Sequence, residues 1–464
     1  MRYVFLLLCG LLLLSKSSET DNATVTYVII NQRNPYNEKL ASEFKTHLKQ
    51  QYEELKLDEP KICTSDDLIN SPAAWTISPL VVSVWNLLDG KATKWVVFLQ
   101  DFTTVVVHTL LDELAKYDPH KEIWVGHALY DTEASIIHHF AFHENPQFFK
   151  YPNAGSGIVL SVPLLKRLKT RIEQGFKQLD FHIDAAHEFA LFIYDGGRGP
   201  MIEHNDKFCT SAEDRSYCAT YPKKFTSCQK VISSSSIFFA IKTCQQFHID
   251  RVEVVKQTWY KYAEKKAFFS DAEDIDVPTI SLNIPNTEHG HCAKTMAILH
   301  YLVKEFHKDS DLNWLALVDD DTILSVAKVV ELTTCHKNAS IPMILGERYL
   351  FGMQGFNYPT GGAGIIINRA ALKLLASKCV CPRNDSPDDM VLGSCALDLG
   401  ITLVHVSQMH QARPEDYASE LLATKDAITF HKHWMIDPVE VYKNWFLEAD
   451  IDLMRGKLIP KTEF

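Results

Sequence analysis

The feature that most constrains the fold is an internal repeat. Three segments of the first half recur in the same order in the second half. The pairs are WVVFLQDFT (95–103) with WLALVDDDT (314–322), YPNAGSGI (151–158) with YPTGGAGI (358–365), and DAAHEFAL (184–191) with DSPDDMVL (385–392). Three matches in one order are hard to explain by chance, so we infer that one structural unit has been duplicated.

The sequence pattern of each copy predicts strands that alternate with helices. Residues 26–30 and 237–241 are apolar runs typical of buried strands, and residues 37–55 have the apolar spacing of an amphipathic helix. Such alternation predicts an α/β fold with mixed, mostly parallel sheets covered on both faces, as in Rossmann-like units. We place the first unit at 19–195 and the second at 237–464. A disulfide-tied linker, which opens with GGRGP, fills 196–236.

The beginning of the chain and its cysteines predict a secreted protein. Residues 1–18 combine a basic start, an apolar run and small polar residues, as a signal peptide does, with a short signal anchor as the alternative. No later stretch is long and apolar enough to span a membrane, and ten cysteines remain after Cys9. Because no CxxC pair occurs, disulfides are favoured over a zinc site, although the spacing leaves their pairing open. We expect the protein in the lumen of the endoplasmic reticulum.

Three carboxylates follow a buried strand in the second copy. Residues 315–318 are apolar, and Asp319, Asp320 and Asp321 come directly after them. Adjacent unpaired carboxylates are too costly for a strand interior, so they belong at its end. There the first and third lie on one face of the backbone and could share a divalent cation. The alternative is a solvated acidic turn.

The first copy lacks these oxygen ligands. Gln100 and Phe102 stand where Asp319 and Asp321 stand in the second copy. A phenylalanine cannot bind a cation. We therefore predict that the first unit is a degenerate, non-catalytic copy.

Three further stretches of the second copy could contribute to a site. Gly361 and Gly362 in TGGAG (360–364) permit a close backbone approach to a ligand, or simply form a tight turn. In SPDDM (386–390), Asp388 and Asp389 fall at a predicted helix start, where acidic residues are also common for the helix dipole alone. His431 in FHKHW (430–434) could complete the ligands of a cation, although an exposed histidine pair usually binds nothing.

These motifs resemble those of the fringe-like β1,3-glycosyltransferases, glycosyltransferase family 31, which have the GT-A fold. The segment Asp250-Arg251 with VKQTW (255–259) resembles the family's early signature, with Lys256 in place of the usual arginine. The resemblance implies two tandem GT-A-like domains and a UDP-sugar donor. It also implies roles for the candidate residues: Mn²⁺ on Asp319, Asp321 and His431, donor contacts from Asp319, Asp320, Gly361 and Gly362, and Asp389 as general base with Asp388 second.

Longer strings narrow the resemblance to family members that glucosylate O-linked fucose on thrombospondin type 1 repeats. They are WTI (75–77), IIHH (136–139), VKQTW (255–259), IPNT (284–287), GERY (346–349), HQARP (410–414) and FHKHWMIDP (430–438). The resemblance implies inverting transfer of glucose from UDP-glucose to the 3-hydroxyl of that fucose. Those members end in a signal of the Lys-Asp-Glu-Leu type, whereas this chain ends Lys461-Thr462-Glu463-Phe464.

Two alternatives stay open at this point. A related β1,3-transferase with another donor, such as UDP-galactose or UDP-N-acetylglucosamine, would have the same motifs, because these donors differ from UDP-glucose by few contacts. The chain could also be a lumenal quality-control protein with vestigial catalysis, whose first half binds the folded acceptor domain. The net charge of -11 argues against a nucleic-acid partner.

Overall fold

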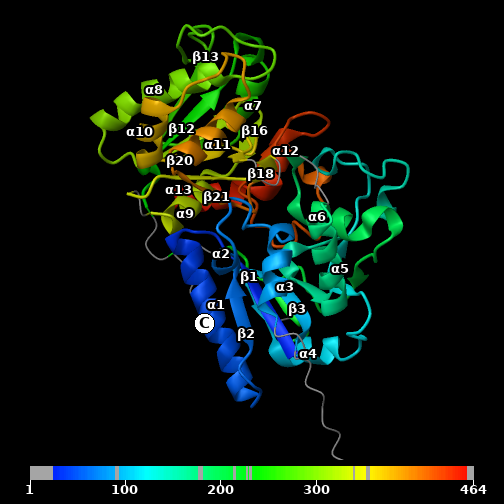
Figure 1. Ribbon diagram of the computed structural model, residues 1–464. Coiled ribbons are helices and arrows are strands. Elements are labelled where there is room, and N and C mark those ends of the chain that lie inside the picture. Colours follow the sequence, from blue (N-terminus) through cyan, green and yellow to red (C-terminus); the bar gives the residue numbers. More distant parts are fainter. Residues whose placement is uncertain are drawn as a thin grey trace, which may run out of the picture.

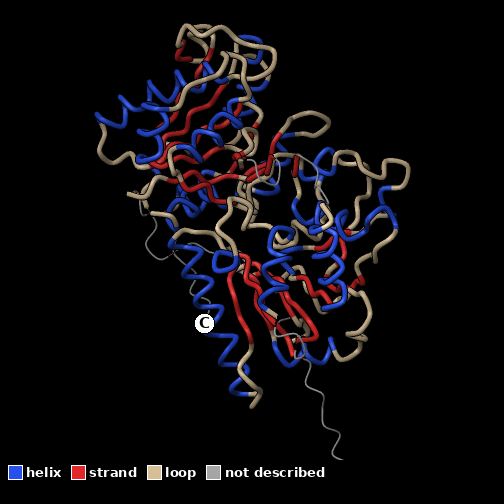
Figure 2. The backbone as a smooth tube through the Cα atoms, viewed as in Figure 1, coloured by secondary structure: helices blue, strands red, loops and turns tan. Residues whose placement is uncertain are grey.

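The structure is a computed structural model that describes residues 24–88, 93–175, 181–212, 216–225, 228, 232–337, 340–351 and 356–456. The predicted signal peptide (1–18) and the C-terminal residues 461–464 lie outside the described residues. No helix among the described residues is long and apolar enough to cross a membrane. The molecule has two lobes, each built on one large sheet flanked by helices (Figures 1 and 2).

The first half contains a six-stranded sheet in the order β10-β5-β8-β3-β1-β2, with β8 antiparallel to both neighbours. Its strands are β1 (Thr24–Ile30), β2 (Lys61–Thr64), β3 (Thr93–Gln100), β5 (Trp124–Gly126), β8 (Ile158–Ser161) and β10 (Glu203–His204). Alternate residues of β1 and β3 enter two hydrophobic cores, one on each face. One face packs on α1 (Pro35–Glu54) and α4 (Val107–Leu114). The other packs on α3 (Val81–Leu87), α5 (Val162–Glu173) and α6 (Ala185–Tyr194).

The second half contains a seven-stranded sheet in the order β14-β13-β12-β15-β20-β17-β21, with β20 antiparallel to both neighbours. Its strands are β12 (Ile237–Lys242), β13 (Lys265–Ser270), β14 (Thr279–Ser281), β15 (Trp314–Asp319), β17 (Met343–Gly346), β20 (Ile365–Asn368) and β21 (Thr402–His405). One face packs on α8 (Cys292–Lys308), α10 (Arg369–Lys378) and α11 (Asp388–Asp398). The other packs on α7 (Arg251–Gln257), α9 (Val326–Cys335) and α12 (Pro438–Trp445), with α13 (Leu447–Met454) beside them.

The two sheets confirm the predicted duplication. The order β2-β1-β3-β8-β5-β10 repeats as β13-β12-β15-β20-β17-β21, with the same parallel and antiparallel pairs. Even the register agrees, because Phe98 faces Ile158 in one half and Leu317 faces Ile365 in the other. Only β14, at one edge of the second sheet, has no counterpart in the first sheet as described.

Residues 196–236 do more than join the halves. β10 adds an edge to the first sheet, and β11 (Thr220–Pro222) pairs with β4 (Thr103–Val105). The segment is tied by two disulfides, one within it and one to the end of α9. The four disulfides of the described residues are Cys209–Cys218, Cys228–Cys335, Cys292–Cys381 and Cys379–Cys395, while Cys63 and Cys244 are free and buried.

The two halves are joined by backbone pairing as well as by side chains. β9 (Phe181–His182) of the first half pairs with β18 (Arg348–Phe351) of the second. The Gln32 amide also donates to the carbonyl of His405 at 3.0 Å and accepts from the His405 backbone N–H at 2.7 Å. The relative placement of the lobes therefore rests on directional bonds, which fix one arrangement better than apolar contact alone.

Candidate functional site

The candidate site lies where two parallel strands of the second sheet end. β12 ends at Lys242 and β15 ends at Asp319, and these two residues are register partners. In α/β sheets, ligands bind in the crevice beyond the carboxyl ends of the strands. The 360–364 turn, the first turn of α11 and β22 (Thr429–His431) converge on the same place.

Asp319, Asp321 and His431 form the group that the sequence predicted as cation ligands. One ligand atom from each lies within 4.8 Å of the other two. Asp319 is partly exposed, whereas Asp321 and His431 are buried. Asp321 follows the strand end, and His431 reaches it because Thr322 of β16 (Thr322–Leu324) pairs in register with His431 of β22.

The orientation of His431 fits a cation. Its Nδ1–H donates to the carbonyl of Gln411 at 3.0 Å, which leaves Nε2 directed at Asp321 Oδ1, 3.0 Å away. Two lone pairs that face each other at that distance need a proton or a metal ion between them. Two carboxylates and one imidazole form a donor set that suits Mn²⁺.

Gln411 and Gly362 position this imidazole. The Gln411 side chain accepts from the N–H of Ala363 at 3.0 Å and from the hydroxyl of Thr360. Gly362 packs against the ring of His431 so closely that a Cβ there would overlap with it. Gly362 was predicted from the sequence to permit the close approach of a ligand. The structure shows that a glycine is needed there because a larger residue would overlap with the ring of His431.

Asp320 is not part of the group formed by Asp319, Asp321 and His431. Its carboxylate accepts from the hydroxyl of Thr243 at 2.7 Å and from Arg251 at 3.1 Å. Burial raises the pKa of Asp320 to about 6. Arg251 also lies 2.9 Å from Asp321, so one guanidinium joins two neighbouring carboxylates. The expected donor contact of Asp320 stays a prediction.

Lys242 joins the acidic triplet to the 388–389 pair. Its ammonium group, which is buried, lies 3.0 Å from Asp319 and 2.6 Å from Asp388. Thr295 of α8 donates to the same Asp388 oxygen at 2.5 Å. Although burial raises the pKa of Asp388, Lys242 and Thr295 lower it to about 2. Asp388 is thus held as a permanent carboxylate within the protein.

Asp389 has a different environment from its neighbour. α11 begins at Asp388, with Pro387 as the residue before it, so both acids lie in the first turn as predicted. Burial and the charge of Asp388 raise the pKa of Asp389 to about 6. Gly361 separates Asp389 from the cation ligands: a Cβ there would lie 3.9 Å from Asp319 Oδ2 and 3.9 Å from Asp389 Cβ. A carboxyl with a raised pKa at this position can take up a proton near neutral pH.

Sequence reasoning missed the residues that hold this site together. Lys242, Thr295 and Gln411 were not predicted to have a role in it. The available signal was a lysine at the end of the buried run IFFAIK (237–242), since a buried lysine needs a carboxylate partner. Its two partners come from distant parts of the chain, so the pairing itself could not be read from local pattern.

The end of β3 in the first half corresponds to the end of β15 in the second. The backbone arrangement is the same at both places, but the side chains differ. Thr322 donates to the carbonyl of Gly362, and Thr103 donates in the same way to Gly155, each at 2.9 Å. In register, Pro222 takes the place of His431. Ile30 likewise stands opposite Gln100, as Lys242 stands opposite Asp319. With Gln100 and Phe102, the described first half has none of the three cation ligands at this place.

Comparison with known proteins shows the family and agrees with the repeat. A family model described as Fringe-like matches residues 31–189 and 232–455, which is a segment in each half. A human protein described as beta-1,3-glucosyltransferase is 41% identical over 446 residues, covering 95% of this chain and 89% of that protein. The mouse protein with the same description is 40% identical and covers 94% of this chain. The Xenopus laevis beta-1,3-N-acetylglucosaminyltransferase lunatic fringe is 24% identical and covers 46%.

Proposed function

Because the chain belongs to the Fringe-like family, we propose that it is an inverting β1,3-glycosyltransferase that transfers glucose from UDP-glucose to O-linked fucose. The acceptor is the 3-hydroxyl of fucose on thrombospondin type 1 repeats. The identity of 41% to the human beta-1,3-glucosyltransferase supports the linkage and the sugar. The fucosylated acceptor is supported by the longer strings of the sequence.

The proposal rests on one observation. The candidate cation ligands and the carboxyl of Asp389, whose pKa is raised, lie together at the end of β15. Asp319 and Asp389 both lie close to Gly361, because a Cβ there would be 3.9 Å from an atom of each. Mn²⁺ bound to Asp319, Asp321 and His431 would supply the positive charge that the diphosphate leaving group needs. A glycine between them leaves room for a sugar that must contact both.

The protein's own residues then have separate tasks. Asp389 takes the proton from the fucose 3-hydroxyl as that oxygen attacks the anomeric carbon from the side opposite the diphosphate. Asp388 cannot do this well, because Lys242 and Thr295 occupy its oxygen and lower its pKa. Asp388 and Lys242 instead fix the first turn of α11 relative to β12 and β15. Gln411 keeps Nε2 of His431 directed at Asp321.

A donor panel tests this proposal. Purified full-length protein is incubated with Mn²⁺, a fucosylated thrombospondin repeat and, in turn, UDP-glucose, UDP-galactose or UDP-N-acetylglucosamine. We expect transfer from UDP-glucose only, with chromatography of the released sugar to separate glucose from galactose. The unfucosylated repeat is the control and should accept nothing. Transfer from another donor alone would overturn the choice of glucose, and transfer from none would favour the binding-protein alternative.

We also propose that the protein works in the lumen of the endoplasmic reticulum. Four disulfides in the described residues support an oxidising compartment. In cells that express the tagged full chain, the protein should colocalise with a lumenal marker and resist added protease until the membrane is dissolved. Digestion by protease in intact microsomes would contradict the proposal.

A further inference from the structure

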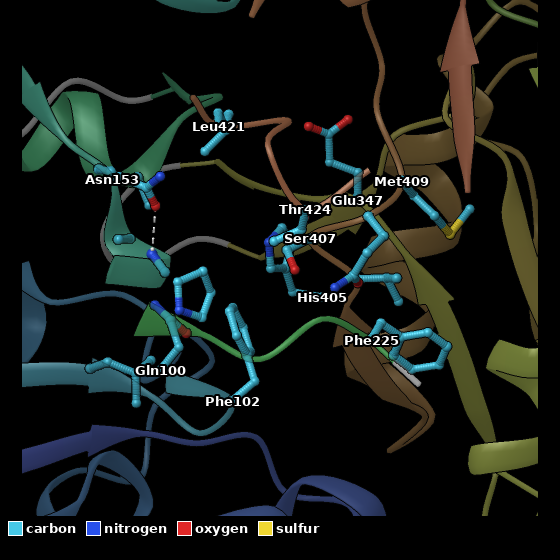
Figure 3. A pocket seen from close by; sticks show the side chains of 18 of the residues that line it. Gln100, Phe102, Asn153, Phe225, Glu347, His405, Ser407, Met409, Leu421 and Thr424 are labelled. Carbon is cyan, nitrogen blue, oxygen red and sulfur yellow. Dashed lines mark hydrogen bonds between the residues drawn. The ribbon is translucent and has the colours of Figure 1, made fainter. Parts of the chain in front are cut away.

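The structure contains a cavity of about 330 Å³ between the two halves, at the degenerate place in the first half. Gln100, Phe102 and Pro222 line it, and these are the counterparts of the three cation ligands. Its other wall comes from the second half, mainly residues 404–410 and 421–427. Figure 3 shows Gln100, Phe102 and Asn153 on one side, with Ser407 and Thr424 on the other. A cavity of this size is within the range of small-molecule sites.

Several polar groups of the cavity are neutral amides and hydroxyls. Within the described part of the chain, the side chains of Gln100, Ser407 and Gln408 have no hydrogen-bond partner. Amide and hydroxyl groups both donate and accept, so they match the hydroxyls of a sugar. The aromatic rings of Phe102 and Phe225 also line the cavity and offer the apolar surface that the C–H face of a sugar ring can cover.

Among the described lining residues, the inner walls hold no buried positive charge at neutral pH. Burial raises the pKa of Glu347 to about 8, so its carboxyl is mainly protonated. Burial lowers the pKa of His405 to about 3 and of His410 to about 4, so both imidazoles are neutral. Asp184 remains a carboxylate, 3.3 Å from the buried His138, which also contacts Asp131 at 2.7 Å. The lysines that line the cavity, Lys223 and Lys224, are exposed to solvent.

These features argue against a nucleoside diphosphate in this cavity and favour another class of ligand. A nucleoside diphosphate needs a cation or a cluster of buried positive groups. The described cavity walls hold neither of them. We propose that this cavity binds an uncharged saccharide of one or two residues, through hydrogen bonds from Gln100, Ser407 and Gln408. This proposal does not depend on the proposed function, because it concerns binding at a place without cation ligands.

The cavity wall leads directly to the candidate site. Glu347 lines the cavity and accepts from the backbone N–H of Gln411 at 2.6 Å. Gln411 in turn holds His431 through its carbonyl. Glu347 and Gln411 therefore connect the cavity wall to the candidate cation ligand His431.

Saturation-transfer NMR on the full chain tests the proposal. The protein carries Asp321→Ala, so that turnover and cation binding are removed and failure of the proposed function cannot affect the result. The probes are the methyl glycosides of fucose, of glucose and of β1,3-glucosylfucose, with UDP as the charged comparison. We expect at least one saccharide to bind with a dissociation constant of about 1 mM or below, and UDP not to compete with it. The three probes show whether the saccharide resembles the acceptor, the donor sugar or the product.

Two further substitutions locate the binding. Gln100→Leu keeps the volume of the side chain and removes its amide, and should weaken binding about tenfold. Ser407→Trp fills the cavity and should abolish binding, whereas Ser377→Trp on the exposed face of α10 should not change it. If Ser407→Trp does not fold, Gln100→Leu decides alone. Absence of saccharide binding, binding that Gln100→Leu leaves unchanged, or binding of UDP that depends on Gln100 would overturn the proposal.

Discussion

The two halves of the molecule share a scaffold and differ in chemistry. Gly157 and Gly364 both have positive φ values, 84° and 87°, at the same point before β8 and β20. Asp101 and Asp320 are both buried at the same point after β3 and β15. Six differences fall at the candidate site: Ile30/Lys242, Gln100/Asp319, Phe102/Asp321, His187/Asp388, Glu188/Asp389 and Pro222/His431.

This difference separates residues that maintain the fold from residues that perform chemistry. The middle aspartate is present in both halves, whereas the candidate cation ligands beside it occur only in the second. Asp101 accepts from Asn37 of α1 at 2.6 Å, and Asp320 accepts from Arg251 at the start of α7. In both halves burial raises the pKa of this aspartate, to about 7 and about 6. The carboxyl between the two candidate ligand positions therefore ties the strand end to the helix that follows the neighbouring strand, β1 or β12, in both halves.

The largest effect should come from Asp321→Ala. Transfer should fall by about 10³-fold or more, because loss of a cation ligand removes several kcal/mol of transition-state stabilisation. Excess EDTA should do the same reversibly in the parent protein. Asp311→Ala, an exposed change before β15, is the matched control and should retain normal activity. Full activity of Asp321→Ala would break the comparison, since the second half would then not need the ligands that the first has lost.

Asp389→Asn should have the next largest effect. It keeps the shape of the side chain and removes its basicity, so turnover should fall about 100-fold with UDP-glucose binding nearly unchanged. Asp388→Asn should cost less. Glu188→Gln changes the counterpart of Asp389 in the first half and should leave turnover near normal. If Asp388→Asn is inactive while Asp389→Asn is not, the base is assigned to the wrong residue of the pair.

The pH profile sharpens the same assignment. Burial and Asp388 raise the pKa of Asp389 to about 6, and only the deprotonated form accepts a proton. Turnover should therefore rise as pH increases through about 6. In Asp388→Asn, loss of the neighbouring negative charge should move this rise to lower pH. A shift to higher pH would contradict the origin given for the raised pKa.

Lys242→Ile tests the connection that the first half lacks. Ile30 occupies this register position there, so the side chain itself is compatible with the scaffold. In the second half it would leave Asp319 and Asp388 without their buried partner, and the free energy of unfolding should fall by about 3 kcal/mol. Lys265→Ala breaks a more exposed pair with Asp309 and should cost less than about 1 kcal/mol in the same denaturant titration. Equal losses for the two variants would mean that Lys242 is not a structural bridge.

The smallest effects should be equal in the two halves. Alanine at Gly157 or Gly364 must adopt a positive φ, and its Cβ would approach Leu99 to 2.8 Å or Val318 to 3.2 Å. Each substitution should lower the free energy of unfolding by about 1–2 kcal/mol. Sensitivity at only one of the two glycines would show that the shared scaffold is less uniform than the registers indicate.

Local pattern predicted the elements and the acidic ligands, because both depend on neighbours in the chain. The strands at 26–30 and 237–241 and the helix at 37–55 are β1, β12 and α1. Alternation along an extended backbone was enough to place Asp319 and Asp321 together, and the internal repeat predicted the matching sheet orders, whereas the non-catalytic character of the first half stays a prediction.

The remaining features depend on contacts between distant residues. Lys242 meets Asp388 across 146 residues, and Gln411 meets His431 from a separate loop. Disulfide pairing was open for the same reason, and Cys63 and Cys244 proved unpaired although an even number of cysteines suggested full pairing. The cavity between the halves requires knowledge of how the two units dock, which neither copy contains alone.

We predict that one scaffold occurs twice in the molecule and that only the second copy holds a cation. Titration of Mn²⁺ into the full-length protein in the presence of UDP, followed by isothermal calorimetry, tests it most directly. We expect one Mn²⁺ per chain in the parent protein and none in Asp321→Ala. Two Mn²⁺ per chain, or one that persists in Asp321→Ala, would contradict it.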